Sequence, residues 1–169
     1  VYSGRYIKNY SVAQDTQLTT AGVLQTSSNT GMSVLADRMP AATATRYFEK
    51  FGFGEITAVD FLGESQGVVN SGDSLDIVTR YNQFFGQGIS VTAAQMAGSY
   101  QALANDGVRL PLRLVDGCRS IDGEWVSAPT AEPVTVVSPT AAQQVVRSLE
   151  TIVSQGPLRN TLSIPGYRV

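Results

Sequence analysis

The stretch Thr26-Ser27-Ser28-Asn29-Thr30-Gly31 gathers small polar side chains between two apolar helical patterns. The apolar residues recur at helical spacing on both sides: Leu18, Ala21 and Gly22 before it, and Met32, Leu35, Ala36 and Met39 after it. Ser and Asn bond to nearby backbone groups and so favour caps and turns over helix interiors. The sequence therefore predicts two helices that meet at this junction. The junction either caps a helix and does nothing more, or holds hydroxyl and amide groups outward.

The composition is that of one globular unit or a piece of one. The residues are 43% hydrophobic and 15% charged, a composition that suits one sizeable core. A chain of 169 residues is too short for two full domains. The net charge is -2 and the basic residues are scattered, so we do not expect nucleic acid or an anionic membrane surface as a partner. No apolar run approaches the roughly 18 residues of a membrane span, and no signal-peptide pattern begins at Val1. Any membrane anchor is expected outside this chain.

Missing residue types exclude most catalytic chemistries. The chain has no histidine, which excludes a Ser-His-Asp site, a Cys-His site and a histidine-ligated zinc centre. The single cysteine, Cys118, excludes an internal disulfide and a thiolate-cluster metal site, and we expect it to be a half-buried apolar residue. No phosphate-binding loop occurs, and Gly86-Gln87-Gly88 lacks the third glycine of a dinucleotide fingerprint. We therefore expect neither a metal nor a cofactor.

Start and stop signals predict further helices. Pro40 and Gly52 bracket one helix, and residues 73–85 carry a mixed pattern that favours a short helix running into a buried aromatic segment. Thr92 and Gln95 form a capping box that starts a helix ending near Asn105, and we expect its Met and aromatic stripe in the core. Ser138-Pro139 begins another helix, which ends at Gly156-Pro157. Its apolar face contains Val146, Leu149, Ile152 and Val153.

The remaining segments predict strands and loops. Residues 53–71 alternate glycines with short apolar pieces and are expected to form an ordered surface excursion. Turn pairs in residues 110–125 favour a small hairpin, and two prolines in residues 129–133 favour an extended linker. A short strand is expected around residues 5–9, and the tail 162–169 is expected to turn into a strand.

Three segments, in order, carry a family resemblance. The first is LTTAGVLQTSSNTGM from Leu18 to Met32, and the second is GQGISVTAAQMA from Gly86 to Ala97. Tyr100, Ala104-Asn105 and Pro111 follow. Together they resemble class B penicillin-binding proteins over nearly the whole chain. The Ser-Ser-Asn form is more similar to the division-type transpeptidases than to the elongation type.

The resemblance implies an α+β fold, in which the mostly helical lobe of a β-lactamase-like transpeptidase is present and the main antiparallel sheet is largely missing. It implies a serine D,D-transpeptidase that cross-links peptidoglycan stem peptides through an acyl-enzyme and is acylated by β-lactams. Ser27 is then expected to relay a proton and Asn29 to bind the acyl side chain of the ligand. Turn and substrate-binding roles are expected for Ser28, Gly86, Gln87 and Gly88. Some relatives have tyrosine in place of Gln87.

Two of the three motifs of that family are absent. Lys8 and Lys50 are the only lysines, and neither follows Ser or Thr at S-x-x-K spacing nor begins a K-T-G. Residues 166–169 resemble the run that leads into the K-T-G strand. We therefore expect residues 1–169 to be one partial transpeptidase domain, inactive alone, with no second domain. The parent protein is expected at the extracytoplasmic face of a bacterial membrane, anchored outside this chain, and the resemblance admits divisome proteins as partners.

Two other interpretations stay open. One is a non-catalytic penicillin- or peptide-binding paralogue or sensor module that uses the polar junction without chemistry. The other is a structural helical domain in which S-x-N occurs by chance. Flanking sequence distinguishes them, because S-x-x-K upstream and K-T-G after Val169 would make the parent an enzyme.

Overall fold

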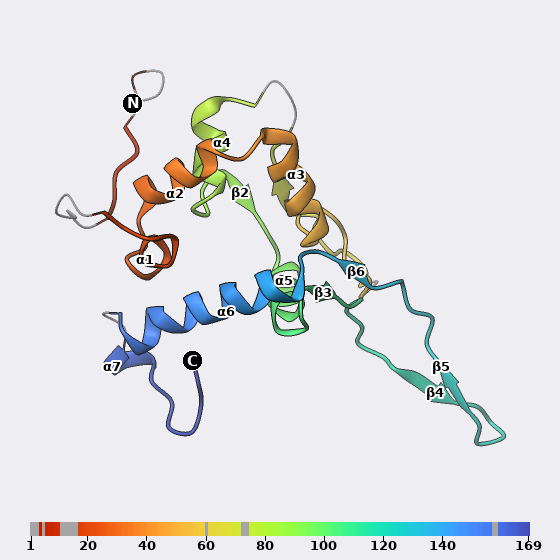
Figure 1. Cartoon of the computed structure of the whole chain (residues 1–169). Helices are drawn as coiled ribbons and strands as arrows, with labels where there is room; N and C mark the ends of the chain where they lie inside the picture. Colours follow the sequence, from red (N-terminus) through yellow and green to blue (C-terminus); the bar gives the residue numbers. More distant parts are fainter. Residues whose placement is uncertain (1–3, 5, 11–16, 60, 72–74, 157–158) are drawn as a thin grey trace.

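The computed structural model describes residues 4, 6–10, 17–59, 61–71, 75–156 and 159–169. Within them the chain forms helices joined by short two-stranded antiparallel sheets. Figure 1 shows the longest helix, α6 (Pro139–Ser154), lying beside the N-terminal helices, while one β-hairpin extends away from the body. In this described part, no helix has both the length and the apolar character needed to cross a membrane.

Helices α1 (Thr20–Gln25) and α2 (Asn29–Asp37) meet at the polar junction, as the sequence predicts. The hydroxyl of Thr19 caps α1 by accepting from the Gly22 N–H at 3.1 Å. At the crossing, a Cβ on Gly31 would lie 2.7 Å from Val23 Cγ2, so only glycine allows the two helices to approach this closely. This contact leaves Val23 6% exposed and fixes where the second helix starts.

The prediction of a helix between Pro40 and Gly52 is confirmed by α3 (Ala41–Lys50), with Pro40 as the residue before it. Gly52 ends it with a left-handed φ of +88°, a conformation that favours glycine. The Phe48 ring packs against Phe53 and Phe84, with centroids 6.4 and 6.2 Å away. This aromatic cluster joins α3 to the end of α4 (Ile77–Gln83).

Helix α4 packs against α2, and side chains of α4 bond to the last residue of α2 and to the segment that follows it. The Tyr81 hydroxyl donates to Asp37 Oδ1 at 2.5 Å, and Arg80 Nη2 donates to the Met39 carbonyl at 2.6 Å. Tyr81 is 2% exposed, so this bond lies in the core. The helix that carries Asn29 is thereby fixed at its C-terminal end.

Helix α5 (Ala93–Ala104) begins at the predicted capping box of Thr92 and Gln95. The buried Gln95 amide also donates to the carbonyls of Glu55 and Gln66, at 2.6 and 2.8 Å, and so anchors the excursion at residues 53–71. Helix α6 begins at Ser138, again as predicted, and packs against both α1 and α5. It is the element that joins the two ends of the helical body.

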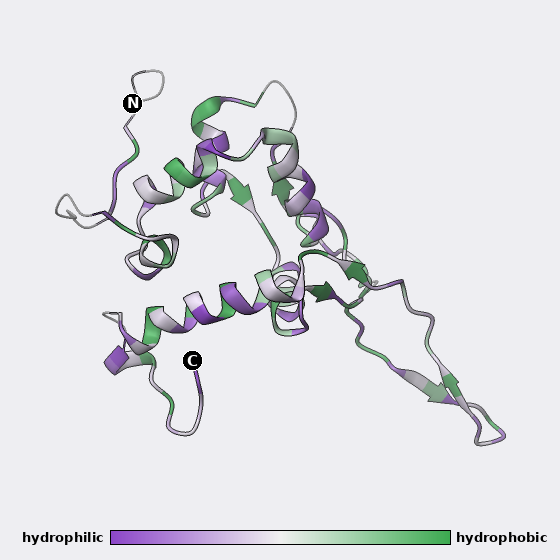
Figure 2. Ribbon diagram, viewed as in Figure 1, coloured by the Kyte–Doolittle hydropathy of each residue, from purple (hydrophilic) through white to green (hydrophobic). Residues whose placement is uncertain are grey.

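Within the described residues, six short strands form three pairs, and the strand arrows beside the helical body are largely green, the hydrophobic end of the scale, in Figure 2. They are β1 (Val68–Val69) with β2 (Ile89–Ser90), β3 (Val108–Arg109) with β6 (Val134–Thr135), and β4 (Gly117–Arg119) with β5 (Trp125–Ser127). The β4–β5 pair is the predicted hairpin, with Cys118 opposite Val126. The other two pairs join distant segments and were not predicted, because two-residue strands carry no alternating pattern.

Several expectations are wrong. Met96 and Tyr100 of α5 are 41% and 55% exposed, because α5 buries the small residues Gly98, Ser99 and Ala102 instead. Cys118 is exposed, because it lies on the hairpin that extends away from the helical body (Figure 1). Residues 6–9 form no strand, and residue 5 lies outside the described residues. The tail forms the short helix α7 (Arg159–Leu162) and then a turn rather than a strand.

Candidate functional site

Ser27 occupies the left-handed position that ends α1. Its φ is +52°, its N–H donates to the Leu24 carbonyl at 3.1 Å, and the next N–H, of Ser28, donates to the Val23 carbonyl at 3.0 Å. This pair of bonds is a Schellman motif, in which glycine is the usual residue at the left-handed position. A side chain there costs about 1–2 kcal/mol. The sequence therefore has a serine at a position where glycine would be more stable.

The two residues that follow begin α2. Ser28 is 5% exposed, and its hydroxyl accepts from the Gly31 N–H at 3.0 Å as the helix cap. Asn29 is the first helical residue, and its amide donates to the Lys8 carbonyl at 2.9 Å. Ser28 is therefore the N-cap of α2, with extended backbone, and the turn lies at Thr26 and Ser27 instead. Its substrate-binding role, like the catalytic roles of Ser27 and Asn29, stays a prediction.

Asn9 is a member of this junction that sequence reasoning missed. Its carboxamide oxygen accepts from the Thr30 N–H at 3.0 Å, from the Thr30 hydroxyl at 3.2 Å and from the Ser28 hydroxyl at 3.4 Å. The sequence predicted only a short strand in this segment and assigned no role to the Asn9 side chain. The contacts span about twenty residues of sequence, a separation that local patterns do not report.

Gly86, Gln87 and Gly88 lie shortly after α4, separated from it by Phe84 and Phe85. Gly86 and Gly88 have φ of +82° and +69°, so the tripeptide is a turn that needs positive φ at both ends. Gln87 is exposed, and the Gly88 carbonyl accepts from the Asn70 amide at 3.0 Å. The turn and the junction are on elements that pack together, since α4 contacts α2. Within the described residues, no hydrogen bond joins Gln87 to Ser27 or Asn29, so their predicted proximity stays a prediction.

The junction presents polar groups without a base to activate them. Among the described residues, no side chain bonds to the Ser27 hydroxyl, and Ser27 is exposed. The same part of the chain contains no cluster of three or more acidic, cysteine or histidine residues that suits a metal ion. A hollow of about 490 Å³ lies beside the junction, and Ser28, Thr30 and Arg38 are among its lining residues.

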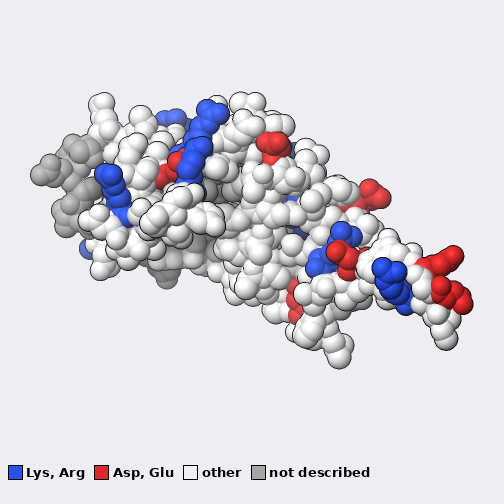
Figure 3. Space-filling view, turned by 90° about the horizontal axis from the view of Figure 1, so that it is seen from below, with Lys and Arg blue, Asp and Glu red and all other residues white. Residues whose placement is uncertain are grey.

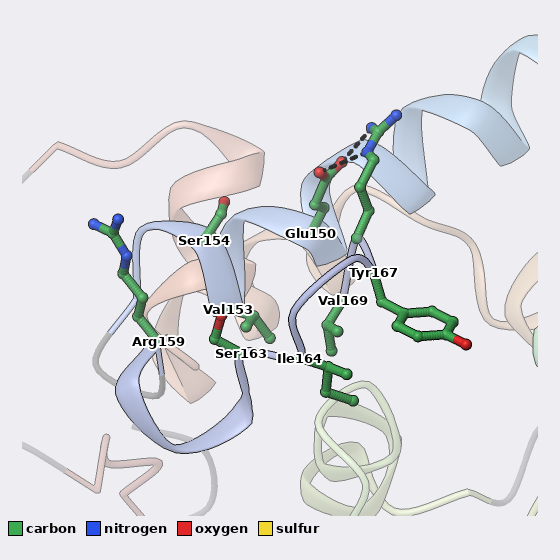
Figure 4. A pocket seen from close by; sticks show the side chains of 9 residues that line it. Glu150, Val153, Ser154, Arg159, Ser163, Ile164, Tyr167 and Val169 are labelled. Atoms are coloured by element: carbon green, nitrogen blue, oxygen red, sulfur yellow. Dashed lines mark hydrogen bonds and ion pairs between the residues drawn. The ribbon is translucent and has the colours of Figure 1, made fainter.

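A second cavity, of about 240 Å³, lies under the C-terminal tail (Figure 4). There Arg168 forms two hydrogen bonds with Glu150, of 2.9 and 2.5 Å, while Arg159 points away from that pair. Hydrogen bonding from Arg168 lowers the pKa of Glu150 below its ordinary 4.5. The Glu150 carboxylate is therefore engaged in an ion pair with Arg168. We do not consider this cavity a candidate for acid–base chemistry, because its carboxylate is already bonded.

The surface shows no concentration of one charge on the face seen from below (Figure 3), where basic and acidic side chains are interspersed. The charges gather most densely near the hairpin end, and both signs occur there. This face therefore offers no patch of a single charge as a candidate site.

The family model for the penicillin-binding protein transpeptidase domain matches residues 1–169. The chain belongs to this family. Its relatives include penicillin-binding protein PbpB of Mycobacterium tuberculosis, 38% identical over 89% of this chain and 23% of the relative. Peptidoglycan D,D-transpeptidase FtsI of Escherichia coli K12 is 31% identical over 99% of the chain and 26% of the relative. The chain thus spans about a quarter of the length of these relatives.

Solved transpeptidase structures resemble the fold closely. A peptidoglycan synthetase from Bifidobacterium adolescentis superimposes with a TM-score of 0.93 at 29% identity, over 99% of this chain and 31% of the other. Penicillin-binding protein 3 of Mycobacterium tuberculosis, solved in complex with aztreonam, superimposes with a TM-score of 0.78 at 39% identity. The match covers 83% of this chain and 31% of the other. The class B resemblance and the α+β fold class, with only a small part of a sheet, are confirmed.

Proposed function

We propose that this chain is the S-x-N-bearing part of a serine D,D-transpeptidase, which cross-links peptidoglycan stem peptides through an acyl-enzyme. The observation that carries the proposal is the backbone of Ser27. A left-handed serine at a glycine position keeps a hydroxyl outward at a cost in stability, and such strain is concentrated at functional sites. Family membership supports the reaction class.

In this proposal Ser27 relays a proton during acylation, and Asn29 binds the acyl amide of the substrate or of a β-lactam. Ser28, Gly86, Gln87 and Gly88 form part of the surrounding wall. A relative crystallised with ampicillin supports β-lactams as ligands. The nucleophile, its lysine and the K-T-G strand come from outside residues 1–169, because neither motif occurs here. We infer that the parent works at the extracytoplasmic face of the cell membrane, where its substrate lies, with divisome proteins as partners.

A non-catalytic penicillin- or peptide-binding module is the second candidate. It is equally compatible with this chain, which has no histidine and no lysine at S-x-x-K spacing. The two candidates differ in whether the parent forms a covalent bond with the antibiotic.

The test is labelling with a fluorescent penicillin, followed by a denaturing gel. We expect no adduct on the 169-residue chain, because an aliphatic hydroxyl without an adjacent base is not nucleophilic. We expect a stoichiometric adduct on the parent protein. A label on the short chain would place the nucleophile inside it, and an unlabelled parent that still binds penicillin reversibly would favour the binding module.

A further inference from the structure

The segment Lys8-Asn9 contacts all three residues that begin α2. The Asn9 oxygen accepts from the Thr30 N–H at 3.0 Å and lies 3.4 Å from the Ser28 hydroxyl. The carbonyl of the preceding residue, Lys8, accepts from the Asn29 amide at 2.9 Å. One short piece of chain therefore holds Ser28, Asn29 and Thr30 together.

The orientation of the Asn9 carboxamide follows from its partners. A backbone N–H can only donate, so the atom that faces Thr30 must be the oxygen. Thr30 is the second residue of α2, and its N–H is one of the donors that a helix leaves without an internal partner. Ser28 satisfies another, that of Gly31. Asn9 thus completes the cap from a remote position in the sequence.

The same segment determines which groups of Asn29 remain for a ligand. The Lys8 carbonyl engages the side-chain nitrogen of Asn29. Within the described part of the chain, no donor bonds to the side-chain oxygen of Asn29. Because an amide group is planar, fixing its nitrogen on a backbone carbonyl also fixes the direction of its oxygen.

We propose that Asn9 is a positioning residue for ligand recognition: it fixes the Lys8 carbonyl against α2 and so orients the Asn29 amide toward the acyl side chain of the ligand. The inference rests on the proposed function. Asn9 touches no reacting atom and acts through Asn29. Its removal should therefore affect ligands that carry an acylamino side chain more than ligands that lack one.

The experiment uses the full-length parent protein and compares acylation rates with two antibiotics. Ampicillin has an acylamino side chain, and 6-aminopenicillanic acid has a bare amine in its place. For Asn9→Ala we expect acylation by ampicillin to slow by roughly 10- to 100-fold, the cost of a small misplacement of a binding group. The rate with 6-aminopenicillanic acid should change by less than about threefold, because that ligand has no amide for Asn29.

Two further variants make the test specific. Asn9→Asp keeps an acceptor oxygen at the N-terminus of α2 and should restore the selectivity for ampicillin. Asn105→Ala removes a side-chain hydrogen bond of similar length, 2.9 Å, from the Asn105 amide to the Val108 carbonyl at the far end of α5, and should leave the selectivity unchanged. The ratio of the two rates is measured on molecules that react, so partial unfolding does not alter it.

The outcomes separate the inference from the function on which it rests. If Asn9→Ala slows both antibiotics equally or neither, or if Asn9→Asp fails as Asn9→Ala does, Asn9 does not position Asn29. If the wild-type parent reacts with neither antibiotic, the proposed function itself is wrong, and the inference falls with it.

Discussion

At the scale of single residues, the junction combines strained and relaxed serines. Ser27 is held in a left-handed conformation and exposes its hydroxyl, whereas Ser28 is buried and caps a helix. Two identical neighbours in the sequence thus have opposite environments, because one ends α1 and the other begins α2. Only the first has a hydroxyl available for chemistry.

Replacing Ser27 should separate stability from activity. In the parent protein, both Ser27→Ala and Ser27→Gly should slow acylation by a proton-relay factor of roughly 10² to 10⁴. Ser27→Gly should nevertheless unfold with a free energy about 1 kcal/mol higher than Ser27→Ala, because glycine is unstrained at φ +52°. Acylation kinetics and chemical denaturation measure the two effects. Wild-type acylation rates in either variant would remove Ser27 from the mechanism.

At the scale of elements, a few side-chain hydrogen bonds join helices to irregular segments. Gln95 is 1% exposed and links α5 to the carbonyls of Glu55 and Gln66. Arg168 links the tail to α6 through Glu150. The first link is buried and independent of pH, whereas the second is an ion pair between exposed or half-exposed groups, so acid should break it.

The Glu150–Arg168 pair should release the tail at low pH. The hydrogen bond from Arg168, and then its charge, lower the pKa of Glu150 in the folded chain below the ordinary value of 4.5. A lowered folded pKa means that the stabilisation is fully present above about 4.5 and is lost as the pH falls through the folded value. An NMR titration of the Glu150 carboxyl carbon should therefore show a midpoint below 4.5.

Two arginine variants control this titration. Arg168→Ala should move the midpoint of Glu150 up toward 4.5, because the partner of the carboxylate is gone. Arg159→Ala should leave it in place, since Arg159 lines the same cavity but points away from Glu150 (Figure 4). Equal shifts in both variants would mean that general charge, rather than the ion pair, sets this pKa.

At the scale of the whole molecule, the helical body leaves an open apolar groove. The groove has a volume of about 530 Å³ and lies between α5, α6 and the C-terminal tail. Its lining is mostly apolar and includes Tyr100, Val146, Leu149 and Val169, with the paired Glu150 and Arg168 at the same surface. Tyr100 is 55% exposed and Val146 is 42% exposed. An exposed apolar surface of this kind favours association, because its burial removes apolar area from water.

The isolated 169-residue chain should therefore self-associate through this groove. Sedimentation velocity should show a sedimentation coefficient that rises with concentration, and Val146→Lys should abolish the rise by placing a charge in the groove. Val126→Lys on the hairpin is the matched control, because Val126 is similarly exposed, at 54%, but lies outside the groove. A monomer at all concentrations, or equal effects of both lysines, would contradict the role of the groove.

The sequence by itself determined most of the helices and where they begin or end, although not the short helix α7. Caps and stops are local: Ser138-Pro139 and the Thr92–Gln95 capping box begin α6 and α5, and Gly52 ends α3, because each acts through bonds to residues only a few positions away. The family resemblance had the same origin, since it rested on contiguous motifs around Ser27 and Gly86.

Tertiary structure alone decided the partners of those elements. The β1–β2 and β3–β6 pairs and the contacts of Asn9 with Thr30 join residues far apart in sequence, and no local periodicity reports such pairings. The same holds for which side of α5 is buried. Its large apolar residues suggested the core face, but close packing selected Gly98 and Ala102, because only small side chains let neighbouring elements approach that helix.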